Sequence, residues 1–224
     1  KKNKLDSSNV IFNKKTVKEI DIINHFKSKE GSLSIDDVIK SRVAETVKKS
    51  KAEIPHAYIN IKLKFKEKLI KDCEILDIII FGHLKIISNY KILINKGSDQ
   101  NSLFFAVDKE SNLFMLKMKV EKENIKLISD TRKKLILSLY RSGYPNKSDL
   151  MPSVSFSSLE NSEIDFQIPI LMPNTSLILG IGGKFRKDNL IFINLTASYD
   201  HSRINGAQIA NYLSDLKKVI DELK

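Results

Sequence analysis

The sequence lacks most of what disulfide-bonded, zinc-binding or membrane-spanning proteins require. Of its 224 residues only Cys73 is a cysteine, which excludes a disulfide framework and a cysteine-rich zinc site. No run of 18 apolar residues is present, so we expect no membrane partner. The N-terminus shows no apolar stretch followed by a small-residue cleavage site. These absences favour a cytoplasmic location, with a mitochondrial or plastid interior left open.

Arginine is also scarce for so basic a chain. The net charge is +11, yet the 38 cationic residues comprise 33 lysines and only 5 arginines, and the lysines are spread along the sequence. Arginine is the residue that grips phosphate and guanine with two parallel hydrogen bonds. We therefore expect no specific nucleic-acid partner, whereas a small anionic ligand is compatible with this charge.

Apolar residues make up 42% of the chain, enough for a packed core, and they follow helical and strand periods in turn. Residues 1–30 are rich in Lys, Asn and Ser and predict an arm or linker, with one folded domain over 31–224. We expect helices from Ile35 to before Pro55, over 125–142 and over 206–223. We expect strands over 59–65, 103–107, 113–120, 154–159, 176–181 and 190–197. Residues 74–94 are ambiguous between helix and strand. The order of elements predicts an α+β fold with a mixed β-sheet and flanking helices.

Several short motifs are better explained by structure than by chemistry. The run from Gly180 to Lys184 resembles a phosphate loop, but it lacks the glycine spacing of that motif and predicts a strand that ends in a tight turn. His25, His56 and His83 have no spacing typical of metal ligands and are expected to be structural or exposed. The histidine spacing therefore predicts no metal cofactor. No histidine is near Cys73 in the sequence, so we do not expect this cysteine to be a nucleophile.

One segment has the composition of a catalytic turn. His201 follows the last apolar strand, and Asn205 and Gly206 then begin an amphipathic helix. A histidine on a rigid turn can take a proton from a thiol or a hydroxyl near neutral pH. The alternative is a buried histidine that satisfies backbone groups at a strand-to-helix junction.

This segment resembles a known family. His-x-x-x-(Asp/Asn)-Gly after a strand is the motif of the chloramphenicol acetyltransferase-like superfamily, and the longer stretch from Ser198 to Leu213 is most similar to the catalytic core of dihydrolipoamide acyltransferases. These enzymes are the transferase components of 2-oxo-acid dehydrogenase complexes. Further segments resemble the same family in the same order, namely 43–56, 104–117, 128–135, 154–159 and 173–182.

The resemblance implies both a fold and an activity. The fold would be a chloramphenicol acetyltransferase-like two-layer sandwich, with residues 31–224 as the acyltransferase catalytic domain. The activity would be acyl transfer between coenzyme A and a dihydrolipoyl thiol, with the lipoyl group on a separate or upstream domain. His201 would be the general base, Ser157 the oxyanion donor and Asn205 the residue that fixes the catalytic loop, with Asp200 in support. The family forms homotrimers in which neighbouring subunits supply the histidine and the serine.

The sequence also departs from the family pattern. Ser202 stands where the family usually has arginine, and Glu160 replaces a glycine after the serine motif. Lys40, with Arg42 two residues beyond, occupies the position of a supporting arginine that in the family pairs with the residue at Asn205. Since Asn205 is neutral, no salt bridge to it can form, although a hydrogen bond can. Two other functions therefore remain open. One is an O-acetyltransferase that acts on a small hydroxyl compound, and the other is a catalytically degenerate trimeric scaffold.

Overall fold

A computed structural model describes residues 35–223 of the chain, except 122, 146–147 and 151. The chain divides into two units, Lys1–Glu45 and Thr46–Lys224. The expected boundary between residues 30 and 31 lies outside the described residues. The first helix, α3 (Ile35–Glu53), ends two residues before Pro55, as the sequence predicts, because a proline restricts the preceding residue to extended geometry.

The second unit is built on one mixed β-sheet. Its strands run in the order β1-β7-β5-β4-β2-β3, and β6 pairs with β7. The pairs β2–β4 and β4–β5 are parallel and the other pairs are antiparallel. The predicted mixed sheet is therefore confirmed. The strands are β1 (His56–Lys66), β2 (Ser102–Lys109), β3 (Asn112–Lys119), β4 (Val154–Ser158), β5 (Leu177–Ile181), β6 (Phe185–Lys187) and β7 (Leu190–Asp200).

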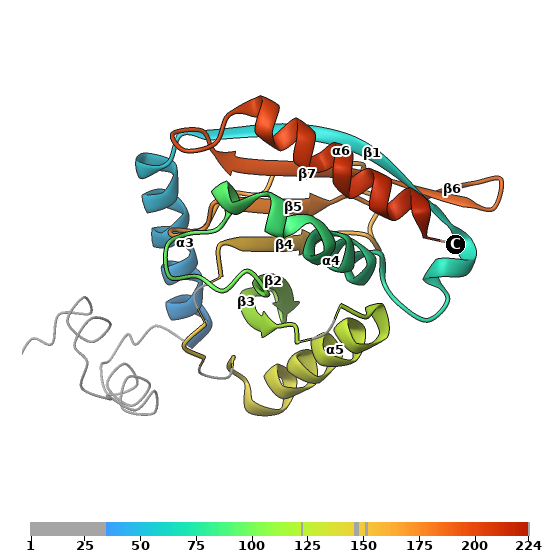
Figure 1. Ribbon diagram of the computed structural model, residues 1–224. Coiled ribbons are helices and arrows are strands. Elements are labelled where there is room, and N and C mark those ends of the chain that lie inside the picture. The colour runs from blue at the N-terminus through green and yellow to red at the C-terminus, as the bar shows by residue number, and fades with distance from the viewer. Residues whose placement is uncertain (1–34, 122, 146–147, 151, 224) are drawn as a thin grey trace, which may run out of the picture. The chain divides into compact units, whose positions relative to one another are not determined.

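Three helices form the second layer. They are α4 (Ile75–Ile86), α5 (Ile125–Ser142) and α6 (Gly206–Glu222). Helix α4 contacts both other helices, while α6 packs on β1 and α5 on β3 (Figure 1). Short 3-10 turns follow β1 (Glu67–Ile70) and α4 (Ile87–Asn89 and Lys91–Leu93). This is the two-layer sandwich that the resemblance implies.

The ambiguous stretch of the sequence is the central helix of this layer. Helix α4 is buried on nearly every side, which explains why its apolar residues show no helical period. Its first turn is closed by Glu74 and Asp77, whose side chains accept hydrogen bonds from each other's backbone N–H. Gly82 lets α6 approach, because a Cβ there would lie 2.7 Å from Leu216 Cδ1.

A long irregular segment, residues 159–176, connects β4 to β5. It lies against the sheet where three glycines leave room. A Cβ on Gly180 would lie 2.8 Å from Pro169 Cδ, and a Cβ on Gly182 would lie 2.2 Å from the carbonyl oxygen of Asp165. A Cβ on Gly183 would meet the carbonyl oxygen of Ser162 at 2.2 Å. The glycine run is therefore explained by close packing of the backbone, as well as by the end of strand β5.

Candidate active site

His201 follows the last residue of β7 on a turn whose backbone is held at several points. Its N–H donates to the carbonyl of Pro55 at 2.9 Å. The carbonyl of Asp200 accepts the N–H groups of Arg203 and Ile204, and the Asp200 carboxylate accepts both the N–H and the hydroxyl of Ser202 at 3.0 and 2.6 Å. Asp200 therefore supports the turn through its hydrogen bonds.

The side chain of His201 is free to meet another molecule. The residue is exposed, and its ring lies 5.7 Å from the ring of buried Tyr199, measured between centroids. Within the described part of the chain, the ring nitrogens of His201 make no hydrogen bond. The alternative of a buried histidine is wrong for this position, because the imidazole faces outward from a rigid turn.

A second histidine, His56, has the structural role that the sequence allows and lies close to this turn. His56 begins β1, directly after Pro55. Its Nδ1 lies 2.8 Å from the carbonyl oxygen of Ile54, and its Nε2 accepts the N–H of Leu171 at 3.2 Å. Ser50 also donates to the carbonyl of Leu171. His56 thus links the start of β1 to the end of the 159–176 segment, close to the carbonyl that holds His201.

Asn205 begins helix α6 and is already engaged there. Its side-chain oxygen accepts the N–H of Gln208 at 2.9 Å, while the Gln208 side chain accepts the N–H of Asn205 at 3.0 Å. This reciprocal pair closes the first turn of the helix. Asn205 thereby joins the His201 turn to α6.

Ser157 lies near the end of β4, and its side chain is half-buried. Its hydroxyl donates to Oε1 of Gln167 at 3.1 Å. The register places Ser157 beside Gly180 of β5, which pairs with Thr196 of β7. Thr196 in turn pairs with Asn60 of β1 and accepts a hydrogen bond from its side chain at 2.8 Å. Because paired residues share one face, these four positions form a row across the sheet.

One chain does not bring His201 and Ser157 together. The register aligns Ser157 with Thr196, and His201, the first residue after β7, lies five residues beyond Thr196 and two strands away from Ser157. With about 3.3 Å per residue and about 4.8 Å per strand, the separation is about 19 Å. The attacking thiol and the carbonyl oxygen of one thioester lie within a few ångströms of each other, which is much less than this backbone separation.

The other predicted supporting residues lie in the first unit. Lys40 and Arg42 are exposed residues of α3. They belong to the unit Lys1–Glu45, whereas Asn205 belongs to Thr46–Lys224. A supporting hydrogen bond from either residue to Asn205 stays a prediction.

Glu160, which replaces a glycine of the family pattern, is buried and accommodated. One carboxylate oxygen accepts the N–H of Leu76 in the first turn of α4 at 3.1 Å, and the other lies 3.3 Å from Nζ of Lys184. Burial raises the pKa of the Glu160 carboxyl, while Lys184 and the Leu76 N–H oppose that rise. The ion pair with Lys184 therefore offsets only part of the cost of burying Glu160, since the pKa of the carboxyl stays raised.

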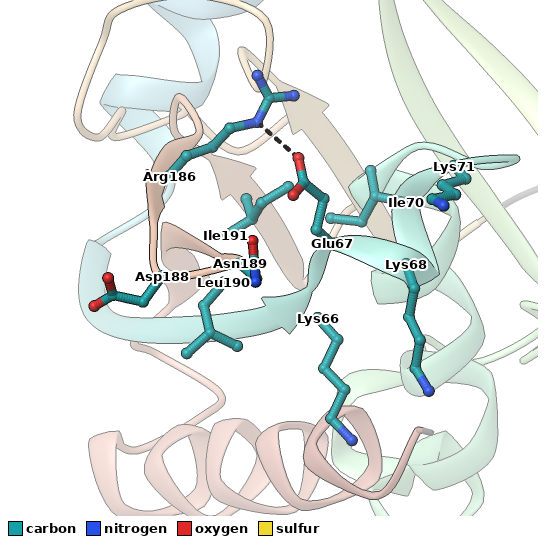
Figure 2. Close-up of a pocket in the computed structure, with 10 residues that line it drawn as sticks. All are labelled: Lys66, Glu67, Lys68, Ile70, Lys71, Arg186, Asp188, Asn189, Leu190 and Ile191. Atoms are coloured by element: carbon teal, nitrogen blue, oxygen red, sulfur yellow. Dashed lines mark ion pairs between the residues drawn. The ribbon is translucent and has the colours of Figure 1, made fainter.

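One hollow among the described residues lies away from both candidate residues. It measures about 670 Å³ and is formed by the end of β1, the turn after it and the β6–β7 hairpin. Figure 2 shows Arg186 directed at Glu67, and the two are paired at 3.6 Å. Lys66 pairs in register with Leu190, at the opposite end of β7 from His201. The hollow is lined by Lys66, Glu67, Lys68, Ile70, Lys71, Arg186, Asp188, Asn189, Leu190 and Ile191.

Two further features of the described residues concern metals and membranes. Among them, no group of three or more His, Cys, Asp or Glu side chains could bind a metal ion. None of the described helices is long and apolar enough to cross a bilayer.

Sequence reasoning missed Gln167, which contacts Ser157, and Lys184, which pairs with Glu160. Gln167 bonds the Ser157 hydroxyl from within an irregular segment, where no periodic pattern marks it. Lys184 was noted only as part of a failed phosphate motif, and its link to Glu160 crosses 24 residues of sequence. Both contacts depend on how the 159–176 segment lies on β5.

Comparisons with known proteins agree with this architecture. Residues 103–224 match the family described as 2-oxoacid dehydrogenases acyltransferase (catalytic domain). A comparison with curated proteins finds no match.

Three solved structures illustrate the shared fold. A probable dihydrolipoamide acetyltransferase from Listeria monocytogenes 4b F2365 is 18% identical with a TM-score of 0.71, covering 88% of this chain and 96% of that one. The dihydrolipoamide acetyltransferase of Azotobacter vinelandii, studied for the role of a serine, a histidine and an asparagine in its catalytic mechanism, is 15% identical with a TM-score of 0.72, covering 90% and 96%. A chloramphenicol acetyltransferase is 9% identical with a TM-score of 0.52, covering 79% and 94%.

Proposed function

Because the chain belongs to the family of 2-oxoacid dehydrogenase acyltransferase catalytic domains, and is thus an acyltransferase, we propose that it moves an acyl group between coenzyme A and a dihydrolipoyl thiol. The observation that carries this proposal is the exposed imidazole of His201 on a turn pinned to Pro55. An outward-facing base on a rigid backbone is what deprotonation of an incoming thiol requires.

In this proposal His201 is the general base. It takes the proton from the attacking thiol, whose sulfur then adds to the thioester carbonyl and forms a tetrahedral oxyanion. Collapse of this intermediate expels the other thiolate, and the proton on His201 passes to that leaving group. A positioned base contributes about 10²–10⁴-fold to the rate.

Ser157 is the proposed donor to the oxyanion. One such donor contributes about 10²–10³-fold, because its hydrogen bond strengthens as negative charge develops. The serine, histidine and asparagine whose role was studied in the Azotobacter vinelandii enzyme are the same residue types as Ser157, His201 and Asn205. We assign to Asn205 the attachment of the catalytic turn to α6.

We further propose that the site forms between two copies of the chain, within a homotrimer. The separation of about 19 Å between Ser157 and His201 supports this arrangement, since a second copy can bring its histidine to the serine of the first. The segment after Ser157 exposes several large apolar side chains, as expected of a surface that a partner covers. They are Leu159, Ile164, Phe166 and Ile168.

The test is an acyl-transfer assay with acetyl-coenzyme A and free dihydrolipoamide. We expect transfer by the wild-type chain and a loss of about 10²–10⁴-fold in kcat for His201→Ala. Ser202→Ala is the matched control, since it removes one side-chain hydrogen bond from the same turn and leaves the Ser202 N–H on Asp200. Thermal unfolding of both variants checks that they are folded.

The two alternatives give different results in the same experiment. An O-acetyltransferase would acetylate small alcohols faster than dihydrolipoamide, and a degenerate scaffold would transfer to neither and need not bind coenzyme A. Full activity of His201→Ala would refute the assignment of the base.

A further inference from the structure

The side-chain amide of Gln167 spans two neighbouring strands. Its Nε2 donates to the carbonyl of Ser157 on β4 at 3.0 Å and to the carbonyl of Ile181 on β5 at 3.1 Å. Both hydrogens of the amide are thereby used. A reversed amide would direct Oε1 at two carbonyl oxygens, so this orientation is determined by its partners.

That orientation decides what the Ser157 hydroxyl can do. The only atom Gln167 offers to it is Oε1, which accepts, so the hydroxyl must donate across the 3.1 Å between them. The serine side chain is thus held in one rotamer by a group that is itself held by two strands. Within the described residues, the Ser157 hydroxyl makes no other hydrogen bond.

The position of Gln167 depends on a glycine next to Ser157. Gly180 pairs with Ser157 in the parallel register of β4 and β5. A Cβ on Gly180 would lie 2.9 Å from Cγ of Gln167 and 2.8 Å from Cδ of Pro169. The missing side chain gives the 159–176 segment the space to bring the amide against both strands.

We propose that Gln167 is a positioning residue that aims the Ser157 hydroxyl and releases its hydrogen as the oxyanion forms. The inference rests on the proposed function, because it acts through Ser157. A charged oxygen is a stronger acceptor than a neutral amide oxygen, so the hydroxyl hydrogen turns from Oε1 to the developing oxyanion. The serine oxygen itself stays in place during this exchange.

The first test removes the amide. Gln167→Met keeps the length of the side chain and loses its hydrogen bonds. We expect kcat to fall about 10-fold while KM for coenzyme A changes little, because a misplaced Ser157 hydroxyl weakens only its hydrogen bond to the oxyanion, which exists in the transition state and not in the ground state. Asn194→Ala is the matched control. Its Nδ2 donates to the carbonyl of Asp165 at 3.0 Å, so it loosens the same segment without touching Ser157, and it should keep wild-type kcat.

The second test adds a pH readout. In Gln167→Glu the ionised carboxyl holds the serine hydrogen more strongly and also faces the two carbonyls that the amide used to bond. We expect kcat relative to the wild type to be lowest above neutral pH and to rise as the pH falls, since a protonated carboxyl again offers one donor and one acceptor. A merely structural loss would give the same ratio at every pH.

A double-variant comparison separates this inference from the proposed function. If Gln167 acts through Ser157, then Ser157→Ala combined with Gln167→Met is no slower than Ser157→Ala alone. Losses that multiply would overturn the inference and leave the proposed function standing. Wild-type activity in Ser157→Ala would overturn the oxyanion role and, with it, the inference. A wild-type chain that transfers no acyl group would overturn both.

Discussion

Two inactive variants should restore each other if the site forms between copies. Ser157→Ala removes the proposed oxyanion donor and His201→Ala removes the proposed base, and each chain keeps the group that the other lacks. The backbones at the two positions are about 19 Å apart within one chain, so in the proposed arrangement a site takes its serine from one copy and its histidine from another. Co-expression of the two variants with different affinity tags, followed by sequential purification, yields mixed oligomers.

The expected recovery follows from counting. In a closed ring assembled at random from equal amounts, a site works when its serine comes from a His201→Ala chain and its histidine from a Ser157→Ala chain. Each event has a probability of one half, so about a quarter of the sites are intact before mixed rings are enriched. The single variants retain about 1% or less, given the contributions of an oxyanion donor and a base. The difference is therefore large enough for an ordinary kcat assay.

Two controls complete this experiment. Wild-type chains mixed equally with His201→Ala should show about half of the wild-type activity, since only the source of the histidine then matters. Variants purified separately and combined without subunit exchange should stay inactive. Mixed oligomers no more active than the single variants would refute an interface that combines the two residues.

Two buried ionisable groups give predictions for stability. Burial lowers the pKa of His83 to about 3, and its Nδ1 lies 2.8 Å from the Tyr212 hydroxyl. The stability from a neutral His83 is complete above its unfolded pKa of 6.5 and is lost as the pH falls toward 3. Between pH 8 and pH 5, urea unfolding should show a loss of about 2 kcal/mol that His83→Asn does not share, and equal losses in both proteins would contradict this. Lys184→Met leaves the Glu160 carboxylate buried without its ion pair, at an expected cost of about 3–5 kcal/mol at pH 7.5. The raised pKa of Glu160 means that this cost is absent below about pH 4.5 and appears as the pH rises, and Glu160→Gln should rescue the variant. A cost independent of pH would show that Lys184 acts through packing alone.

Elements with a clear period could be predicted from the sequence. Strand β1 alternates Leu63 and Phe65 inward with Lys64 and Lys66 outward, and the structure has this pattern. Helix α5 ends at Gly143, which adopts a positive φ of 79°, as expected for a glycine that follows a helix. In such segments one face is exposed to solvent and the other is buried, so the alternation of polar and apolar residues indicates the type of secondary structure.

Secondary-structure elements that lack a solvent-exposed face could not be predicted from the sequence. Helix α4 is apolar over most of its length, because it lies between α5, α6 and the sheet. A continuous apolar run of that length fits a buried helix as well as a buried strand. Strand β6 was not predicted for the opposite reason, since its three residues are all exposed and are too few to show a strand period.

The candidate site divides in the same way. His201 and Asn205 lie in one short stretch whose motif is visible in the sequence. Gln167 is invisible there, because its role depends on Gly180 and Ser157 arriving beside it from two different strands. Contacts that join distant segments through single hydrogen bonds leave no local pattern.

The departures from the family pattern near the turn can be weighed by what Asn205 already does. An aspartate at this position would carry a negative charge that needs a nearby cation. By the resemblance, an arginine in the first helix supplies that cation. Asn205 is neutral, exposed and bonded to Gln208 in both directions. Asparagine is as good at this position of a helix as aspartate. The turn that carries His201 is therefore anchored by hydrogen bonds within its own unit, through Asp200 and Asn205.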